Sequence, residues 1–171
     1  MKTRAILAVT AALMLSACGF RPLYGTSSIP EGAESAFATI RVEPIPATND
    51  SDRIGYLVAD ALDRTLHTPG HHESTVYALA IKLTDERRGL AVQDDASITR
   101  YNYRVTATWT LTPIGAEKSI ANGRAETTAS YNVVDSQYAT LVARKDAEDR
   151  AAREIAEQIK LRLAVSLMKP S

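Results

Sequence analysis

The sequence has 171 residues, 20 basic and 20 acidic side chains, 45% hydrophobic residues and a single cysteine. Balanced charge excludes nucleic-acid binding by bulk charge, the apolar share excludes a disordered chain, and one cysteine excludes both an internal disulfide and a paired-cysteine zinc site. We therefore expect one ordinary globular domain.

The N-terminus has the pattern of an export signal. Lys2 and Arg4 precede an apolar run, residues 5–15, that only Thr10 interrupts. The run is too short for a bilayer, which needs about 20 apolar residues, but it suits a secretory signal peptide. Small residues then lead directly to Cys18.

The run Leu15-Ser16-Ala17-Cys18 resembles the bacterial lipobox. The resemblance implies that residues 1–17 are a signal peptide and that the Cys18 thiol is the lipid-attachment site, where several acyl chains would hold the protein stably on a membrane. Gly19, in place of an aspartate that retains such proteins at the inner membrane, favours the cell outer membrane. The alternative is an ordinary signal peptide that ends near a free cysteine.

The next segment, Gly19–Gly25, places Phe20, Leu23 and Tyr24 around a proline that disfavours a helix before it. These apolar side chains need a surface, either their own domain or a packing partner. The run CGFRPLYG resembles the mature start of the LptE family of lipopolysaccharide (LPS)-assembly lipoproteins, in its alphaproteobacterial form.

The resemblance implies a function without catalysis or cofactor. In the LptE family the lipoprotein sits as a plug inside the β-barrel of LptD in the outer membrane. It binds LPS, assists assembly of the barrel and helps deliver LPS to the outer leaflet. The implied partners are therefore an LptD-like β-barrel, LPS and the membrane that holds the anchor.

The first elements of the mature chain follow from composition and period. Residues 26–35 are polar and predict a tether, so the anchor and tether occupy residues 18–35. Alternation over residues 36–45 predicts a strand that its prolines end. Apolar residues at three- and four-residue steps predict a helix over residues 54–66, and Asn49, Asp50 and Ser51 offer N-caps.

Three strands and a long helix follow. Alternating patterns predict strands over residues 74–95, 100–112 and 121–133. The inward residues of the last strand are small, which would let a helix approach closely. Residues 136–168 predict a helix whose apolar side carries Tyr138, Leu141, Val142, Ala152, Ile155, Ala156, Ile159, Leu163 and Leu167.

The element order predicts an α+β domain over residues 36–171. We expect a two-layer sandwich with two helices on one face of a four-stranded, mainly antiparallel sheet, in the order β-α-β-β-β-α. Such a fold leaves the other face of the sheet without a helical cover.

Strand parity places four cations on that other face, near Glu126 and a series of threonines: Lys82, Arg100, Arg104 and Arg124. Solubility and the strand propensity of threonine would explain this composition without a ligand. Guanidinium groups also bind phosphates in a bidentate manner, and hydroxyls suit sugars. Because the resemblance implies LPS binding, we predict that these four cations bind LPS.

Catalytic and metal-binding patterns are weak. His67, His71, His72 and Glu73 cluster in a short loop, but a solvated helix end is the simpler interpretation, and we predict no metal site. The adjacent carboxylates of Asp94–Asp95 suit a turn better than acid-base chemistry. There is no glycine-rich phosphate loop and no serine elbow, so we predict that the protein is not an enzyme.

Two functions remain open at this point. The first is an outer-membrane lipoprotein that plugs and helps assemble an LPS-export barrel. The alternative is an auxiliary lipoprotein of a phospholipid or solute ABC-type transporter, with a similar anchor but no barrel partner.

Overall fold

The structure is a computed structural model that describes residues 33–48, 51, 53–67, 74–92 and 98–167. Cys18, the segment from Phe20 to Tyr24, the loop with His71, His72 and Glu73, and the pair Asp94–Asp95 lie outside the described residues. The elements are α2 (Ala33–Ala38), β1 (Ile40–Val42), α3 (Ile54–Leu66), β2 (Tyr77–Val92), β3 (Ile98–Pro113), β4 (Ala121–Asn132) and α4 (Gln137–Leu167).

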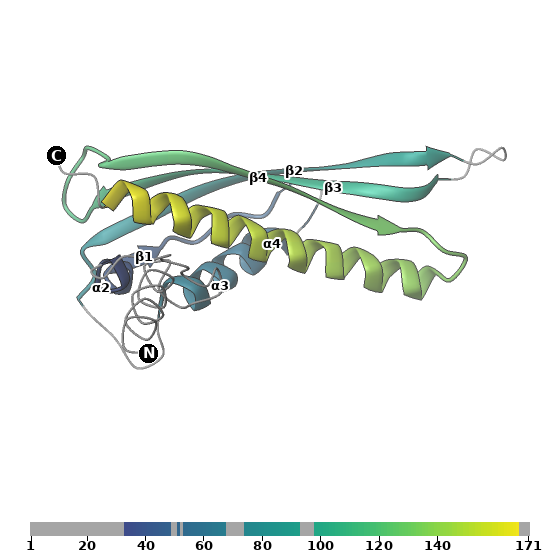
Figure 1. Cartoon of the computed structure of the whole chain (residues 1–171), viewed down its shortest axis with the longest axis horizontal. Coiled ribbons are helices and arrows are strands. Elements are labelled where there is room, and N and C mark those ends of the chain that lie inside the picture. Colours follow the sequence, from purple (N-terminus) through teal and green to yellow (C-terminus); the bar gives the residue numbers. More distant parts are fainter. Residues whose placement is uncertain (1–32, 49–50, 52, 68–73, 93–97, 168–171) are drawn as a thin grey trace, which may run out of the picture. The chain divides into compact units, whose positions relative to one another are not determined.

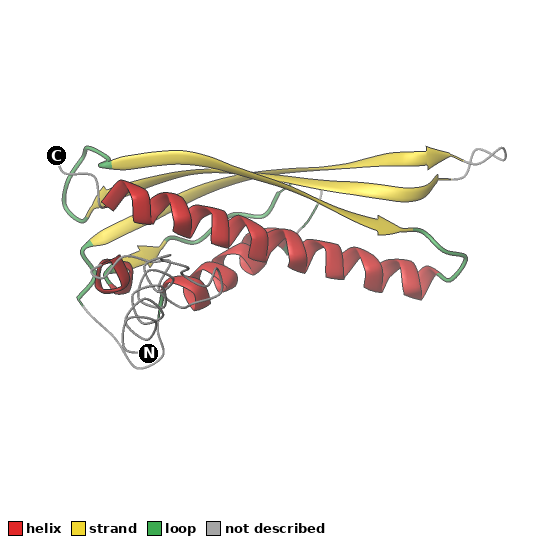
Figure 2. Ribbon diagram, in the orientation of Figure 1, coloured by secondary structure: helices red, strands yellow, loops and turns green. Residues whose placement is uncertain are grey.

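The strands form one sheet in the order β1-β2-β3-β4, in which β1 runs parallel to β2 and the other neighbours are antiparallel. The described helices lie on one side of this sheet (Figure 2). The α+β sandwich predicted from the sequence is therefore confirmed. The helix predicted over residues 54–66 coincides with α3, and the three long strands lie within a few residues of their predicted limits.

The strand predicted over residues 36–45 is wrong in its first half and too long. Helix α2 occupies its start and the last residues of the predicted tether, and β1 is only three residues long. Phe37 of α2 and Ile40 of β1 are both buried, whereas a single strand would place an odd-numbered and an even-numbered residue on opposite faces. The Thr39 hydroxyl donates to the Ala36 carbonyl at 2.7 Å at the end of this helix.

The start of α3 differs from the predicted capping. The N-cap residue is Arg53, which makes no side-chain cap bond. Ser51, one of the predicted caps, is buried and its Oγ accepts from the Arg53 N–H at 3.3 Å. The Ser51 side chain therefore bonds to Arg53, the residue before α3, and not to a residue within the helix.

The core lies between the helices and the odd-numbered side chains of the three long strands, with Ile40 of β1 added to it. On β3 these include Tyr103, Val105, Trp109 and Leu111, all buried. Facing them, α4 buries Ala147, Ala151, Ala152, Ile155, Ala156, Ile159, Leu163 and Ala164. The small inward residues of β4 do admit a helix, since α4 packs against that strand.

Two features of α4 differ from the predicted pattern. Tyr138, Leu141 and Val142 belong to the predicted apolar side, yet all three are exposed, because α4 buries no described side chain before Ala147. Glu148 lies in the charged stretch of residues 144–150 and outside the predicted apolar side, yet it is 1% exposed. The helix therefore packs only over its C-terminal two thirds.

Two side chains of α4 also bond to backbone groups at the outer edge of β4. The Gln158 side chain accepts from the Glu126 N–H at 3.3 Å and donates to the Glu126 carbonyl at 3.0 Å. Eight residues earlier on α4, the Arg150 side chain donates to the Ser130 carbonyl at 3.1 Å. These bonds satisfy backbone groups that an unpaired strand edge would offer to another chain.

A polar cluster lies between the sheet and the helices. Glu148 accepts from Arg53 at 3.2 Å and from Arg144 at 3.1 Å, which joins the start of α3 to α4. The Tyr103 hydroxyl donates to Asp85 Oδ2 at 2.6 Å. Among the described residues, Asp85 Oδ1 is buried without a hydrogen-bond partner, so the Tyr103 hydroxyl is the donor on which this carboxylate depends.

The contact between Trp109 and Gly123 gives the first testable prediction. A Cβ at Gly123 would lie 2.6 Å from Trp109 Cζ2, so Gly123→Ala must displace the largest buried side chain of the core. We expect a loss of about 1–3 kcal/mol in the free energy of unfolding, measured by urea denaturation. Asn122→Ala, whose side chain is exposed on the same strand, should change it by less than about 0.5 kcal/mol. Equal effects of the two changes would contradict this packing.

The Tyr103 hydroxyl gives a pH prediction. Burial, followed by the hydrogen bond and charge of Asp85, raises the pKa of Tyr103 above its ordinary value of 10.0. Folding therefore favours the neutral phenol, and this contribution to stability is complete below pH 10 and is lost as the pH rises above it.

Tyr103→Phe should be less stable than the original protein by about 1–3 kcal/mol at neutral pH, because Asp85 loses its donor. Above pH 10 the stability of the variant should fall less steeply. Urea unfolding midpoints followed from neutral pH to pH 11 test this, and parallel curves for the two proteins would rule it out.

Candidate functional site

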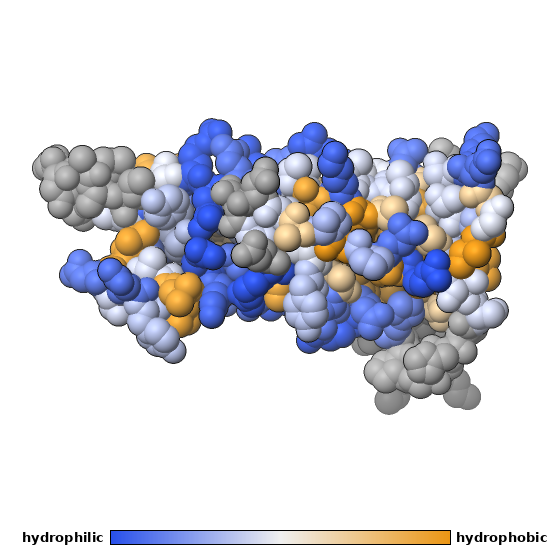
Figure 3. Space-filling view, turned by 180° about the vertical axis from the view of Figure 1, so that it is seen from behind, coloured by the Kyte–Doolittle hydropathy of each residue, from blue (hydrophilic) through white to orange (hydrophobic). Residues whose placement is uncertain are grey.

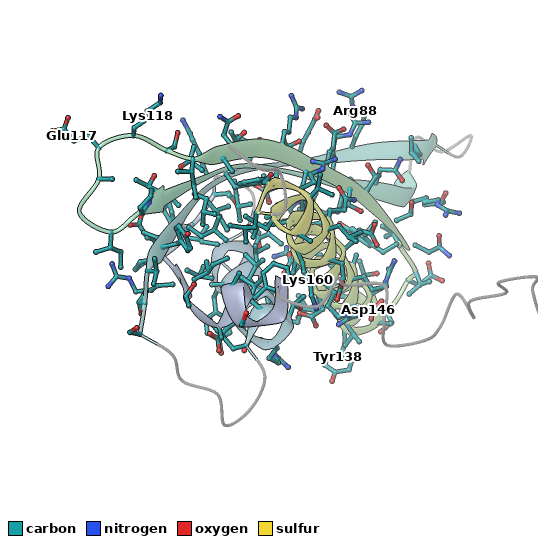
Figure 4. All side chains as sticks on the ribbon, turned by 60° about the vertical axis from the view of Figure 1, so that its left-hand side comes forward. Arg88, Glu117, Lys118, Tyr138, Asp146 and Lys160 are labelled. Atoms are coloured by element: carbon teal, nitrogen blue, oxygen red, sulfur yellow. The ribbon has the colours of Figure 1, made fainter. Side chains whose placement is uncertain are left out.

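The candidate site is the sheet face that points away from the described helices. It consists of the even-numbered positions of β2, β3 and β4, and we call it the open face. No described residue at these positions is buried. Arg88, labelled in Figure 4, stands on this side of the sheet and points away from the helices. The open face therefore presents its side chains to whatever surrounds the domain.

The strand register places all four predicted cations on the open face. Lys82 and Arg124 flank Thr108 in one row across the three strands. Arg104 lies four residues from Thr108 along β3, and Arg100 lies four residues further on. At about 3.4 Å per residue these steps are each about 14 Å. The four cations form a stripe along the sheet rather than a pocket.

Acidic side chains divide this stripe. Glu126 accepts from Arg124 at 2.9 Å and lies 3.6 Å from Arg104 Nε, so both guanidinium groups share one carboxylate. Among the described residues, Lys82 and Arg100 have no ion-pair partner. Exposed ion pairs contribute only about 0–1 kcal/mol. A ligand phosphate could therefore draw either arginine away from Glu126 at little cost.

The row of Lys82, Thr108 and Arg124 is the part of the open face best suited to an anion. Neighbouring strands lie about 4.8 Å apart, which places the two cations about 10 Å apart across the row, with a hydroxyl between them. An ammonium, a hydroxyl and a planar guanidinium together match the oxygens of a phosphate on a sugar. The row contains no acidic residue.

The sequence pattern did not single out Arg88, which lies on the open face beside Asn102 and pairs with Glu86 at 2.8 Å. The signal was present, because Arg88 keeps the even parity of Lys82 along β2. The looser alternation after Thr84 hid it. With Arg88, the open face of the three long strands carries five basic side chains and two acidic ones.

His67 has a structural role at the end of α3. Its Nε2 donates to the Ile40 carbonyl at 2.9 Å, and its Nδ1 lies 2.8 Å from Asp63 Oδ1. The imidazole thus joins the end of α3 to β1. Within the described ranges, no three His, Cys, Asp or Glu side chains are grouped so as to hold a metal ion.

Comparison with known proteins decides the family. The sequence model of the LptE family, described as lipopolysaccharide-assembly, matches residues 37–163. The chain belongs to the LptE family. The resemblance first given by CGFRPLYG is confirmed by a match that lies wholly outside that run and covers the four cations of the open face.

Solved structures agree with the LptE-family fold. A Caulobacter crescentus protein described as a lipoprotein is 26% identical, with a TM-score of 0.62 over 81% of this chain and 98% of its own. The rare lipoprotein B of Shewanella oneidensis is 14% identical, with a TM-score of 0.52 over 75% and 95% of the two chains. A minor lipoprotein of Acinetobacter baumannii is 14% identical, with a TM-score of 0.54 over 78% and 98%. A search of curated proteins finds no match.

None of the described helices of this LptE-family chain combines the length and apolar character that crossing a membrane requires.

Proposed function

We propose that this LptE-family chain is an outer-membrane lipoprotein that binds LPS on its open face during LPS assembly, with an LptD-like β-barrel as its partner. The observation that carries the proposal is the stripe of Lys82, Arg124, Arg104 and Arg100 along one exposed sheet face of a chain from this family. Binding would be non-catalytic, and no cofactor takes part.

The chemistry of LPS fits this surface. Lipid A carries phosphates on a sugar backbone. A surface that binds it therefore needs separated positive charges for the phosphates and hydrogen-bonding groups for the sugar. The open face offers separated cations with threonines between them along β3: Thr106, Thr108, Thr110 and Thr112. The Lys82–Thr108–Arg124 row would bind one phosphate, while Arg104 and Arg100 would contact the rest of the LPS molecule.

The family match and the polarity of the open face support the proposed barrel partner. The lumen of a membrane barrel is polar, so a plug needs a polar surface against it. The apolar group of Phe20, Leu23 and Tyr24 would pack against the same partner. The family match favours this account over an auxiliary lipoprotein of a transporter.

Attachment to the membrane is proposed through Cys18. The lipobox pattern places its thiol at the mature N-terminus, where a thioether to diacylglycerol and further acyl chains would form. Two or more chains give stable attachment.

The proposed ligand row gives the functional prediction. Lys82→Glu combined with Arg124→Glu should weaken LPS binding at low salt by at least about tenfold, because two attractive contacts of at least about 0.7 kcal/mol each become repulsive. Binding of labelled LPS to the purified protein is the measurement, and circular dichroism confirms that the fold is kept.

The matched control is Lys145→Glu combined with Arg153→Glu. Both residues are exposed on α4, and the change in net charge is the same. This control should bind LPS within about twofold of the original protein, a difference of about 0.4 kcal/mol. If both double variants lose affinity equally, net charge rather than the open face governs binding, and the proposed site is wrong.

A further inference from the structure

The open face is hollowed at one end of the sheet, and we call this cavity the end hollow. Its volume is about 360 Å³, within the roughly 300–1,000 Å³ of small-molecule sites. Figure 1 shows β1, the start of β2 and the turn between β3 and β4 at this end. The residues that line the hollow come from these three segments and include Arg41, Glu43, Ala78, Ala80, Thr112 and Gly115.

Small side chains of β2 form the floor of the end hollow. Ala78 and Ala80 are even-numbered, so their methyl groups lie on the open face. The register places Ala78 between Arg41 of β1 and Thr112 of β3. A methyl group between a guanidinium and a hydroxyl leaves a depression that has an apolar floor and polar walls.

Backbone hydrogen bonds fix both walls. The Glu43 N–H donates to the Leu79 carbonyl at 3.0 Å, which continues the pairing of β1 by one residue and sets Glu43 beside Ala80. In the β3–β4 turn the Ala116 N–H donates to the Pro113 carbonyl at 3.0 Å. Gly115 has a φ of 83°, which other residues rarely adopt. The folded chain therefore holds the hollow open without a ligand.

The polar groups of the walls are available to a ligand. Among the residues that the structure describes, the side chains of Arg41, Glu43 and Thr112 have no ion-pair or hydrogen-bond partner. Arg41 supplies donors, Glu43 supplies acceptors, and Thr112 supplies both. Sugar hydroxyls both donate and accept, and the C–H groups of a sugar ring suit a methyl floor. A bare phosphate fits less well, because the Glu43 carboxylate repels it.

The end hollow adjoins the Lys82–Thr108–Arg124 row. Ala80 precedes Lys82 by two residues on the same face of β2, a step of about 7 Å. Thr110 lies beside Ala80 on β3 and offers a further hydroxyl. Figure 3 shows hydrophilic side chains along the upper margin, where the sheet lies. A sugar in the hollow can therefore present a phosphate to the row.

We propose that the end hollow binds the sugar ring whose phosphate is held by the Lys82–Thr108–Arg124 row. Glu43 accepts hydrogen bonds from the sugar hydroxyls, Arg41 and Thr112 donate to its oxygens, and the methyl floor contacts one side of the ring. The open face thus recognises a sugar phosphate rather than any polyanion. The inference rests on the proposed binding of LPS to the open face and adds a second subsite to it.

The mapping experiment records amide chemical shifts of the isotope-labelled protein with glucosamine 1-phosphate and with inorganic phosphate. We expect both probes to shift the signals of Lys82, Thr108 and Arg124, and only the sugar phosphate to shift those of Ala80 and Gly115 as well. If the two probes shift the same signals, the sugar subsite is wrong while the proposed LPS site stands. No shift at the row with either probe would overturn both.

Glu43→Ala separates sugar recognition from attraction by charge. If charge alone governed binding, removal of this acid would strengthen it. We expect instead that glucosamine 1-phosphate binds about three- to tenfold more weakly, the range of one lost hydrogen bond, and that inorganic phosphate binds no more weakly. Glu157→Ala removes the same charge from an exposed position on α4 and should change neither affinity by more than about twofold. Unchanged or stronger binding of the sugar phosphate to Glu43→Ala would overturn the inference.

Discussion

The alternation of β3 is the constraint on which the rest of the structure depends. Each odd-numbered side chain in its centre is buried under the helices, and each even-numbered one is left on the open face. Trp109 fixes this alternation, because its ring lies so close to Gly123 that no other residue would fit there without displacement. A shift of one residue would exchange the two faces, placing threonines and arginines against α4. The cationic stripe is therefore a consequence of the same register that builds the core.

Helix side chains bond to some backbone groups at the described edges of the sheet, whereas β1 pairs with β2 only as far as Leu79 and no described helix covers the open face. Gln158 and Arg150 satisfy the backbone of β4, and His67 donates to the carbonyl of Ile40 in β1. Side chains from α4 and from the end of α3 thus stand where further strands would otherwise pair. The long α4 thus has a role besides covering the core, since its side chains bond to three backbone groups of β4.

Much of this fold could be predicted because the periodic signals are long. The strict alternation from Arg100 to Thr112 and the apolar stripe of α3 gave the correct elements, and the parity of β2, β3 and β4 placed the four cations correctly. Short or interrupted signals failed. Residues 36–45 alternate, yet the structure places the end of α2 and the three residues of β1 there. Tertiary packing rather than local alternation decides that Phe37 is buried. Glu148 is buried because Arg53, 95 residues earlier, reaches it, and no local pattern carries that information.

The central claim is that the open face, rather than the outer surface of α4, meets the ligand and the partner. The most direct measurement is photocrosslinking in living cells from a photoreactive amino acid at Thr108, compared with one at Glu157, which is exposed on α4. The account predicts products with LPS or with a large β-barrel protein from position 108 and few from position 157. Products from position 157 alone would contradict it.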